Sequence, residues 1–178
     1  MITAYLIASH LISDFILQTT RLVSWKMKSF RGTLFHVAVF CFVSLAVLLP
    51  LLYNPQVWIV ILLIGIVHFF TDQAKINIEL KKDPSDIPFI ADQGIHYLSL
   101  VIGGYFLDSL TLLKVEDWFG AQVYGNFYFW IILLITIYLI YSLKLALIHK
   151  TRKKILQKIF IFTFVYLVYF GTFIVVFK

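Results

Sequence analysis

The chain has 178 residues, of which 61% are hydrophobic and 18% aromatic, while only 13% are charged. Soluble domains are about 45–50% apolar, so this composition excludes an ordinary soluble domain and indicates an integral membrane protein. The net charge of +6 fits basic loops on one side of a membrane better than nucleic-acid binding. The single cysteine, Cys41, excludes an internal disulfide.

Six apolar segments approach the ~20 residues that a helix needs to cross a bilayer. They predict an all-α fold in which residues 1–178 form a single domain, an integral membrane bundle of six transmembrane helices. The predicted helices span about 2–20, 33–52, 56–75, 89–107, 127–148 and 159–177.

The N-terminal segment is expected to be a retained first helix rather than a signal peptide. It has no Lys or Arg before the apolar stretch, and His10 and Asp14 interrupt that stretch. Residues 21–31, which follow it, carry four basic side chains around Trp25. This pattern is typical of an interfacial linker.

Lys and Arg are concentrated in alternate connections between the predicted helices. The linkers after the first, third and fifth helices are basic, the turn after the second has neither residue, and the loop after the fourth has Lys114 alone. By the positive-inside rule, the basic linkers are cytoplasmic and both termini are external.

Three predicted helices each carry a histidine and an aspartate four residues apart, which places both side chains on one helix face. With the expected topology, these side chains fall within roughly 3–15 Å of the cytoplasmic boundary at ~1.5 Å per residue. A buried acid without a partner is costly in a membrane, so repeated pairs at one depth indicate a shared site. The pairs are His10 with Asp14, His68 with Asp72, and His96 with Asp92, and His36 lies at the same depth.

Imidazole nitrogen and carboxylate oxygen suit Zn, Mn or Fe better than Ca, so the expected cofactor is a divalent metal, with Zn preferred over Mn and Fe. Helix bundles build metal centres from such inward-facing pairs. Two of the aspartates, Asp14 and Asp92, are also candidate catalytic bases. The alternative, that each pair neutralises itself locally, stays open. The candidate metal ligands are His10, Asp14, His36, His68, Asp72, Asp92 and His96.

Other polar residues surround these candidates in the sequence. Gln18 and Gln93 are expected to hydrogen-bond to the metal ligands. Lys75 and Arg31 lie at the predicted cytoplasmic rim, where they are candidates for binding a phosphate or carboxylate of the substrate. The other interpretation, that both residues anchor helices to anionic headgroups, stays open.

These residues together resemble an uncharacterised family of small bacterial inner-membrane proteins, catalogued as a domain of unknown function. The resemblance covers mainly residues 5–100 and implies the bacterial inner membrane, but no activity. A looser similarity to membrane-bound metal-dependent hydrolases implies metal-dependent hydrolysis by analogy only. The motifs are His10-x-x-x-Asp14-Phe15-x-x-Gln18, a histidine like His36, His68-x-x-x-Asp72-x-x-Lys75, and Asp92-Gln93-x-x-His96.

The expected function is a membrane-embedded metal-dependent hydrolase that acts on an amphipathic phosphate or ester substrate from the cytoplasmic leaflet. The first alternative is a transporter or channel for protons or divalent cations in which the pairs form a relay. The second is a structural membrane subunit. Membrane lipid is the expected partner, nucleic acid is not, and homo-oligomer formation is left open.

Overall fold

In the computed structural model, which describes residues 2–81, 86–110, 126–148 and 152–177, the secondary structure is helical without strands. Contacts divide the chain into two compact units, Met1–Leu113 and Lys114–Lys178. The sequence predicts one domain over residues 1–178. Each unit is described by itself below.

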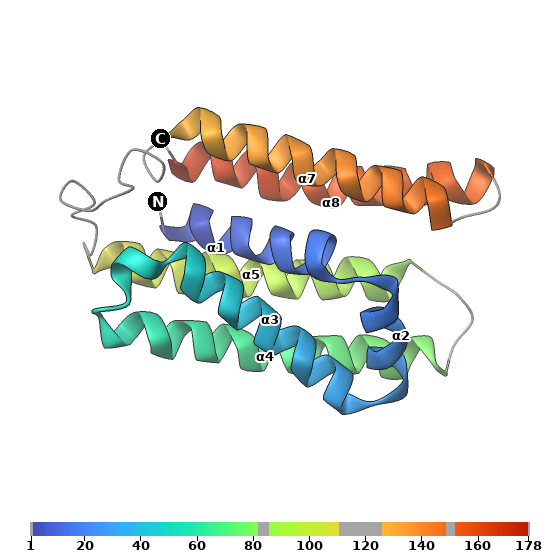
Figure 1. Ribbon diagram of the computed structural model, residues 1–178, viewed down its shortest axis with the longest axis horizontal. Coiled ribbons are helices and arrows are strands. Elements are labelled where there is room, and N and C mark those ends of the chain that lie inside the picture. The colour runs from blue at the N-terminus through green and yellow to red at the C-terminus, as the bar shows by residue number, and fades with distance from the viewer. Residues whose placement is uncertain (1, 82–85, 111–125, 149–151, 178) are drawn as a thin grey trace. The chain divides into compact units, whose positions relative to one another are not determined.

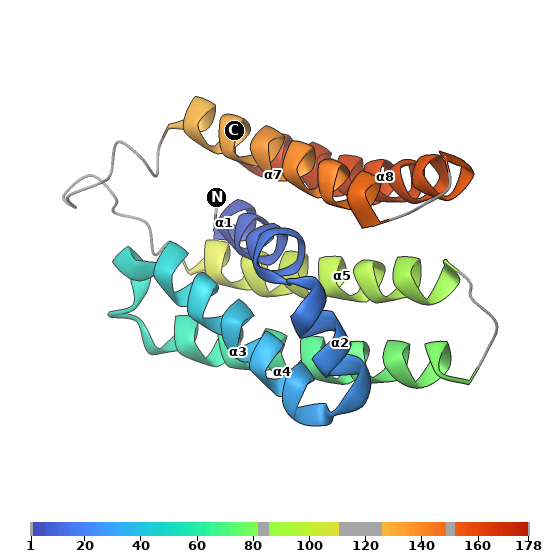
Figure 2. The ribbon, with the colours of Figure 1, turned by 45° about the vertical axis from the view of Figure 1, so that its right-hand side comes forward.

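The first unit is a bundle in which α5 packs against α1 and α4, while α3 packs against α1, α2 and α4 (Figure 1). The short helix α2 lies at one end of this bundle in both views (Figures 1 and 2). Its elements are α1 Ile2–Leu11, the π-helix η1 Ile12–Leu17, α2 Thr20–Lys28, α3 Phe30–Val47, the 3₁₀ turn η2 Leu49–Leu51, α4 Pro55–Glu79 and α5 Ile87–Ser109.

Side-chain caps explain where three of these helices begin. Thr19 accepts a hydrogen bond from the backbone N–H of Leu22 at the start of α2, and Ser29 accepts one from Arg31 at the start of α3. Asn54 caps α4, whose first residue is proline. A cap satisfies a backbone donor that has no partner within the helix, and proline is tolerated at the first helical position.

The first predicted helix differs from the structure. A single helix over 2–20 was expected, but α1 ends at Leu11, a π-helix follows, and Gln18 leaves helical geometry before α2. The Ser13 hydroxyl donates to the His10 carbonyl at 2.9 Å, so a side chain competes for a carbonyl at the point where the α-helix ends. The predicted linker over 21–31 is largely helical, because α2 occupies Thr20–Lys28.

The other predicted helices differ mainly in their ends. Helix α3 begins three residues before the predicted 33–52 and stops at Val47, ahead of the turn that contains Pro50. Helices α4 and α5 extend beyond 56–75 and 89–107 at both ends. Hydropathy marks the apolar part of a helix, and these helices continue into polar residues.

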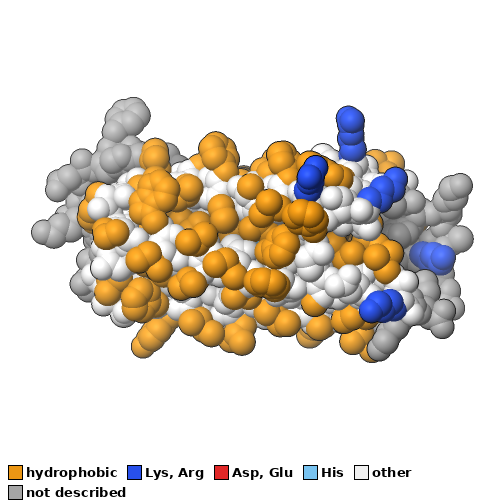
Figure 3. All heavy atoms as spheres, turned by 90° about the horizontal axis from the view of Figure 1, so that it is seen from below, with side chains coloured by type: hydrophobic (Ala, Val, Ile, Leu, Met, Phe, Trp, Pro, Cys, Tyr) orange, Lys and Arg blue, Asp and Glu red, His pale blue; other side chains and the backbone are white. Residues whose placement is uncertain are grey.

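The polarity of the first unit is inverted relative to that of a soluble protein. Trp58, Leu62 and Phe70 of α4 are exposed, whereas His68 and Asp72 of the same helix are buried. One face of the molecule is covered mainly by apolar side chains, with Lys and Arg gathered at one end (Figure 3). Exposed apolar surface of this extent marks contact with a membrane or a partner.

Within the described residues, four helices are long and apolar enough to cross a membrane, judged by their length and composition. They span Phe30–Val47, Pro55–Glu79, Tyr128–Leu147 and Lys154–Val175. The apolar segment Ile2–Leu17 is shorter, and α5 is not among the four. The prediction of six transmembrane helices is therefore supported for four.

At the end of the first unit remote from α2, Asp108 joins α5 to the start of α1. Its carboxylate accepts hydrogen bonds from the Ile2 N–H at 2.7 Å and from the Thr3 hydroxyl at 2.9 Å. Burial raises the pKa of Asp108, but these hydrogen bonds outweigh burial and hold the pKa below its usual value. Gly104 permits the approach, because a Cβ there would lie 2.5 Å from the Thr3 Cα.

The second unit pairs α7, Phe127–Ile148, with α8, Arg152–Phe177. The bounds of α7 are those predicted, whereas α8 begins before the predicted 159–177. Aromatic rings fill the contact: Tyr138 and Phe162 stack with centroids 5.5 Å apart, and the Tyr166 hydroxyl donates to the Leu134 carbonyl. The candidate site residues all lie in the first unit.

Candidate metal centre

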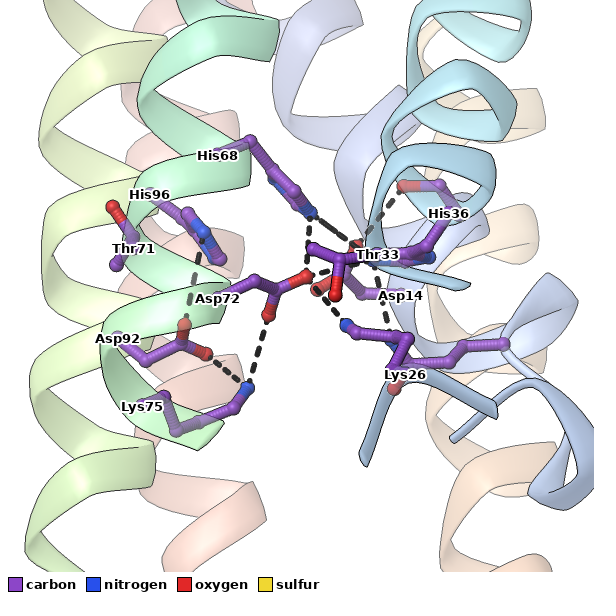
Figure 4. Close-up of polar contacts among 12 residues, drawn as sticks. Asp14, Lys26, Thr33, His36, His68, Thr71, Asp72, Lys75, Asp92 and His96 are labelled. Atoms are coloured by element: carbon purple, nitrogen blue, oxygen red, sulfur yellow. Dashed lines mark hydrogen bonds and ion pairs between the residues drawn. The ribbon is translucent and has the colours of Figure 1, made fainter. Parts of the chain in front are cut away.

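The seven predicted metal ligands lie together in the core of the first unit, and none of them is more than 7% exposed. They come from four parts of the bundle that are distant in sequence (Figure 4). His10 is on α1, Asp14 on η1, His36 on α3, His68 and Asp72 on α4, and Asp92 and His96 on α5.

Three of these side chains form a compact triangle of possible ligand atoms. His36 Nε2 lies 3.0 Å from His68 Nε2. Asp14 Oδ1 lies 3.3 Å from His36 Nε2 and 3.6 Å from His68 Nε2. With Zn–ligand bonds of 2.0–2.1 Å, two ligand atoms of a tetrahedral site are roughly 3.3 Å apart. The spacing of this triangle therefore fits a divalent metal held by two histidines and one carboxylate.

Asp72 lies beside this triangle. Its Oδ2 atom is 3.7 Å from the Nε2 atoms of both His36 and His68. The same oxygen accepts a hydrogen bond from Lys26 at 2.5 Å, and Oδ1 accepts one from Lys75 at 3.2 Å. Two ammonium groups therefore hold this carboxylate next to the imidazoles.

A second group of possible ligands contains Asp72, Asp92 and His96, with one atom of each within 4.8 Å of the others. Lys75 donates to Asp92 Oδ2 at 2.7 Å, and His96 Nε2 lies 3.8 Å from Asp92 Oδ1. Within the described part of the chain, Asp92 Oδ1 and both ring nitrogens of His96 are buried without a hydrogen-bond partner.

Aromatic contacts set the planes of the histidine rings. The His68 ring stacks on His96 with centroids 4.0 Å apart and on Phe40 with centroids 5.1 Å apart. The His10 ring meets His96 edge-on at 5.2 Å. His10, His68 and His96 are accordingly a third group whose nitrogens lie within 4.8 Å of one another.

The pairs four residues apart lie within ion-pair distance of one another but beyond hydrogen-bond distance. The closest approach is 3.5 Å between His10 and Asp14, 3.7 Å between His68 and Asp72, and 3.8 Å between Asp92 and His96. Several contacts between different helices are shorter, among them Lys26 with Asp72 at 2.5 Å, Lys75 with Asp92 at 2.7 Å and His36 with Asp14 at 3.3 Å. Strong hydrogen bonds are shorter than about 3.2 Å, so the cluster is held by contacts across the bundle.

The two predicted glutamines, Gln18 and Gln93, both contact the cluster, whereas the predicted cation Arg31 lies outside it. Gln18 Nε2 is 3.2 Å from His36 Nε2. Gln93 lies between His10 at 3.4 Å and Asp92 at 3.2 Å. Lys75 binds two aspartates and is 17% exposed, whereas Arg31 is exposed at the start of α3.

Sequence reasoning missed Lys26, which it placed in the linker with other cations. The structure buries Lys26 on α2 at 5% exposure, in contact with Asp72. A Cβ at Gly32 would lie 2.6 Å from the backbone of Trp25 and Lys26, so the absence of a side chain lets α2 lie against α3. The spacing of Leu22 and Lys26, the two buried residues of α2, is the signal that predicts one inward face.

The charges of the cluster do not balance. Three carboxylates face two ammonium groups, which leaves one negative charge if the imidazoles are neutral. A bound cation or an additional proton would offset this charge. Buried uncompensated charge is costly, so the cluster favours binding a positive species.

The chain belongs to the family described as protein of unknown function (DUF3307), whose model matches residues 2–120. The match includes every residue of the cluster and confirms the resemblance to an uncharacterised family. No curated protein and no solved structure matches the chain significantly.

Proposed function

We propose that the chain is a membrane-embedded enzyme that uses a divalent metal to hydrolyse an amphipathic phosphate or ester substrate. The single observation that carries the proposal is the triangle of His36, His68 and Asp14, with atom spacings of 3.0–3.6 Å. The looser similarity to membrane-bound metal-dependent hydrolases agrees with it by analogy.

Two histidines and one carboxylate are a donor set used by catalytic zinc sites, which keep a further position for water or substrate. The same set suits non-haem iron, and Mn is a further candidate. A bound divalent ion would polarise a phosphoryl or carbonyl oxygen and lower the pKa of a water molecule. His36, His68 and Asp14 would hold the ion.

Asp72 lies beside the triangle and would be a further ligand, because Oδ2 lies 3.7 Å from two triangle atoms. Lys26 and Lys75 favour its ionised form and fix its position. The sequence predicts Asp14 and Asp92 as candidate bases, but Asp14 belongs to the triangle and Asp92 binds Lys75. Lys26 would also stabilise negative charge on the reacting group.

The amphipathic substrate follows from the surroundings of the site. Apolar side chains cover the outside of α3 and α4, while polar groups gather inside near α2. We propose that the substrate enters from the cytoplasmic leaflet of a bacterial inner membrane, past the part-exposed Lys75. The basic linkers favour an orientation with that end inside and both termini outside by the positive-inside rule.

Reconstitution into lipid nanodiscs tests the proposal with two probes, a fluorogenic phosphate monoester and a fluorogenic long-chain acyl ester. We expect turnover that a chelator removes, that added Zn or Mn restores, and that His36→Ala lowers at least 100-fold, since one residue of a catalytic unit removes most of the rate. Asp108→Asn, a carboxylate change outside the cluster, is the matched control. Turnover that persists in chelator and in His36→Ala would overturn the proposal.

A second candidate is proton or cation transport. The observation that favours it is the 3.0 Å contact between the Nε2 atoms of His36 and His68, which is short enough for a proton to pass between the two rings. One proton would also balance the residual charge of the cluster. Proton flux into liposomes that requires His68, from protein that binds no metal, would favour transport over hydrolysis.

A further inference from the structure

Asp92 and His96 form a part of the cluster that the triangle does not use. They lie one helical turn apart on α5, and Asp72 of α4 faces them. His96 is 1% exposed, and its Nε2 atom lies 3.8 Å from Asp92 Oδ1 (Figure 4). This distance is too long for a hydrogen bond and short enough for two ligands of one ion.

The described structure leaves these atoms without hydrogen-bond partners. Both ring nitrogens of His96 and the Oδ1 atom of Asp92 are buried and unpaired within the described residues. Buried polar atoms in proteins are nearly always paired, so such atoms point to a missing ligand. Imidazole and carboxylate together are ligands for a divalent metal.

We propose that Asp92, His96 and Asp72 bind a second divalent cation, so that Asp72 bridges two metal positions. This inference rests on the proposed function, because it needs the first metal at the triangle. The Oδ2 atom of Asp72 faces His36 and His68, whereas Oδ1 faces Lys75 beside Asp92. One carboxylate thus reaches both positions.

Two metals about 3.5–4 Å apart stabilise both the attacking and the leaving oxygen in phosphate hydrolysis. Because two metal positions suit in-line displacement at phosphorus, we take a phosphate ester as the substrate class. The reaction transfers the phosphoryl group to water, breaks the P–O bond of the ester and releases an alcohol. Water is the only co-reactant.

The ammonium group of Lys75 occupies part of the proposed second metal position. This group lies 2.7 Å from Asp92 Oδ2 and 3.2 Å from Asp72 Oδ1. Because Lys75 is 17% exposed, its side chain has a route outward when a cation binds. Lys75 is therefore expected to compete with the second metal and to weaken its binding.

The test is the metal content of the purified full chain in detergent after equilibration with Zn or Mn and removal of unbound metal. We expect two equivalents per chain in the wild type, one in His96→Gln, and two in the control Asp108→Asn. Circular dichroism checks that each variant is folded. In Lys75→Met, we expect the second equivalent to bind at least tenfold more tightly than in the wild type.

The outcomes separate this inference from the proposed function. One equivalent in the wild type overturns the second site and leaves the first. No bound metal overturns both. The assignment of His96 to the second position alone is overturned by either of two results: His96→Gln still binds two equivalents of metal, or it binds none. The number of metal ions bound per wild-type chain tests the second site even if a variant fails to fold.

Discussion

At the scale of single residues, the cluster combines seven positions that the repeated His–Asp spacing predicts with Lys26, which that spacing does not include. The repeated spacing of His and Asp predicted seven buried side chains at one depth, and all seven lie in one core. Lys26 was not predicted because its position depends on how α2 packs against α3. A basic residue beside an apolar segment is usually solvated, and only the missing side chain of Gly32 brings this one inward.

Lys26→Met tests whether this buried cation stabilises the cluster. Removing one partner of a buried ion pair costs up to about 3–5 kcal/mol, and here Asp72 loses one of its two ammonium partners and keeps Lys75. We expect a lower thermal unfolding temperature for the metal-free protein in detergent. Lys28→Met, on the same helix but exposed, should leave that temperature unchanged. Equal effects of the two variants would show that Lys26 is not a partner of Asp72.

Gln18→Ala tests the polar group that contacts His36 at 3.2 Å. Loss of a side chain that orients a metal ligand weakens metal binding about 10–100-fold. We expect this increase in the dissociation constant for Zn, measured by competition with a chromophoric chelator. Gln56→Ala removes an exposed glutamine of α4 and serves as the control. An unchanged affinity in Gln18→Ala would remove Gln18 from the centre.

At the scale of elements, hydropathy predicted the helices well where they are uniformly apolar. The bounds of α7 match the prediction, and the apolar parts of α3, α4 and α5 were found. The π-helix at Ile12–Leu17 was missed because hydropathy does not report which carbonyl a backbone N–H reaches. This segment carries Asp14, and π-helical segments often occur at functional sites.

Gly32→Ala tests the packing of α2 on α3. The added Cβ would lie 2.6 Å from the backbone of Trp25 and Lys26, so α2 must move and carry Lys26 away from Asp72. We expect a lower unfolding temperature and faster proteolysis of α2. Gly94→Ala is the matched control, because nothing lies within 4 Å of a Cβ there. The close packing of α2 is refuted if Gly32→Ala is as stable as Gly94→Ala.

At the scale of the whole molecule, composition predicted an integral membrane protein, and the first unit has ionisable side chains inside and apolar side chains outside. Composition could not predict which helices share the polar core. All cluster residues belong to the unit Met1–Leu113, and α7 and α8 contribute none of the predicted ligands. Which helices contact one another depends on side-chain complementarity, and apolar composition alone does not encode it.

Topology is testable because Cys41 is the only cysteine in the sequence. In a Cys41→Ser background, Asn54→Cys and Lys28→Cys place single thiols in the α3–α4 turn and at the end of α2. By the positive-inside rule, a membrane-impermeant maleimide should label Asn54→Cys in intact cells and Lys28→Cys only after lysis. The reverse pattern would invert the topology.

The central claim is that His36, His68 and Asp14 bind a divalent metal. Anomalous X-ray scattering at the zinc edge, from crystals of the full chain grown with Zn, tests it most directly. We predict an anomalous peak about 2.0–2.2 Å from the Nε2 atoms of both histidines and the Oδ1 atom of the aspartate. An ordered cluster without a peak at this position would contradict the claim.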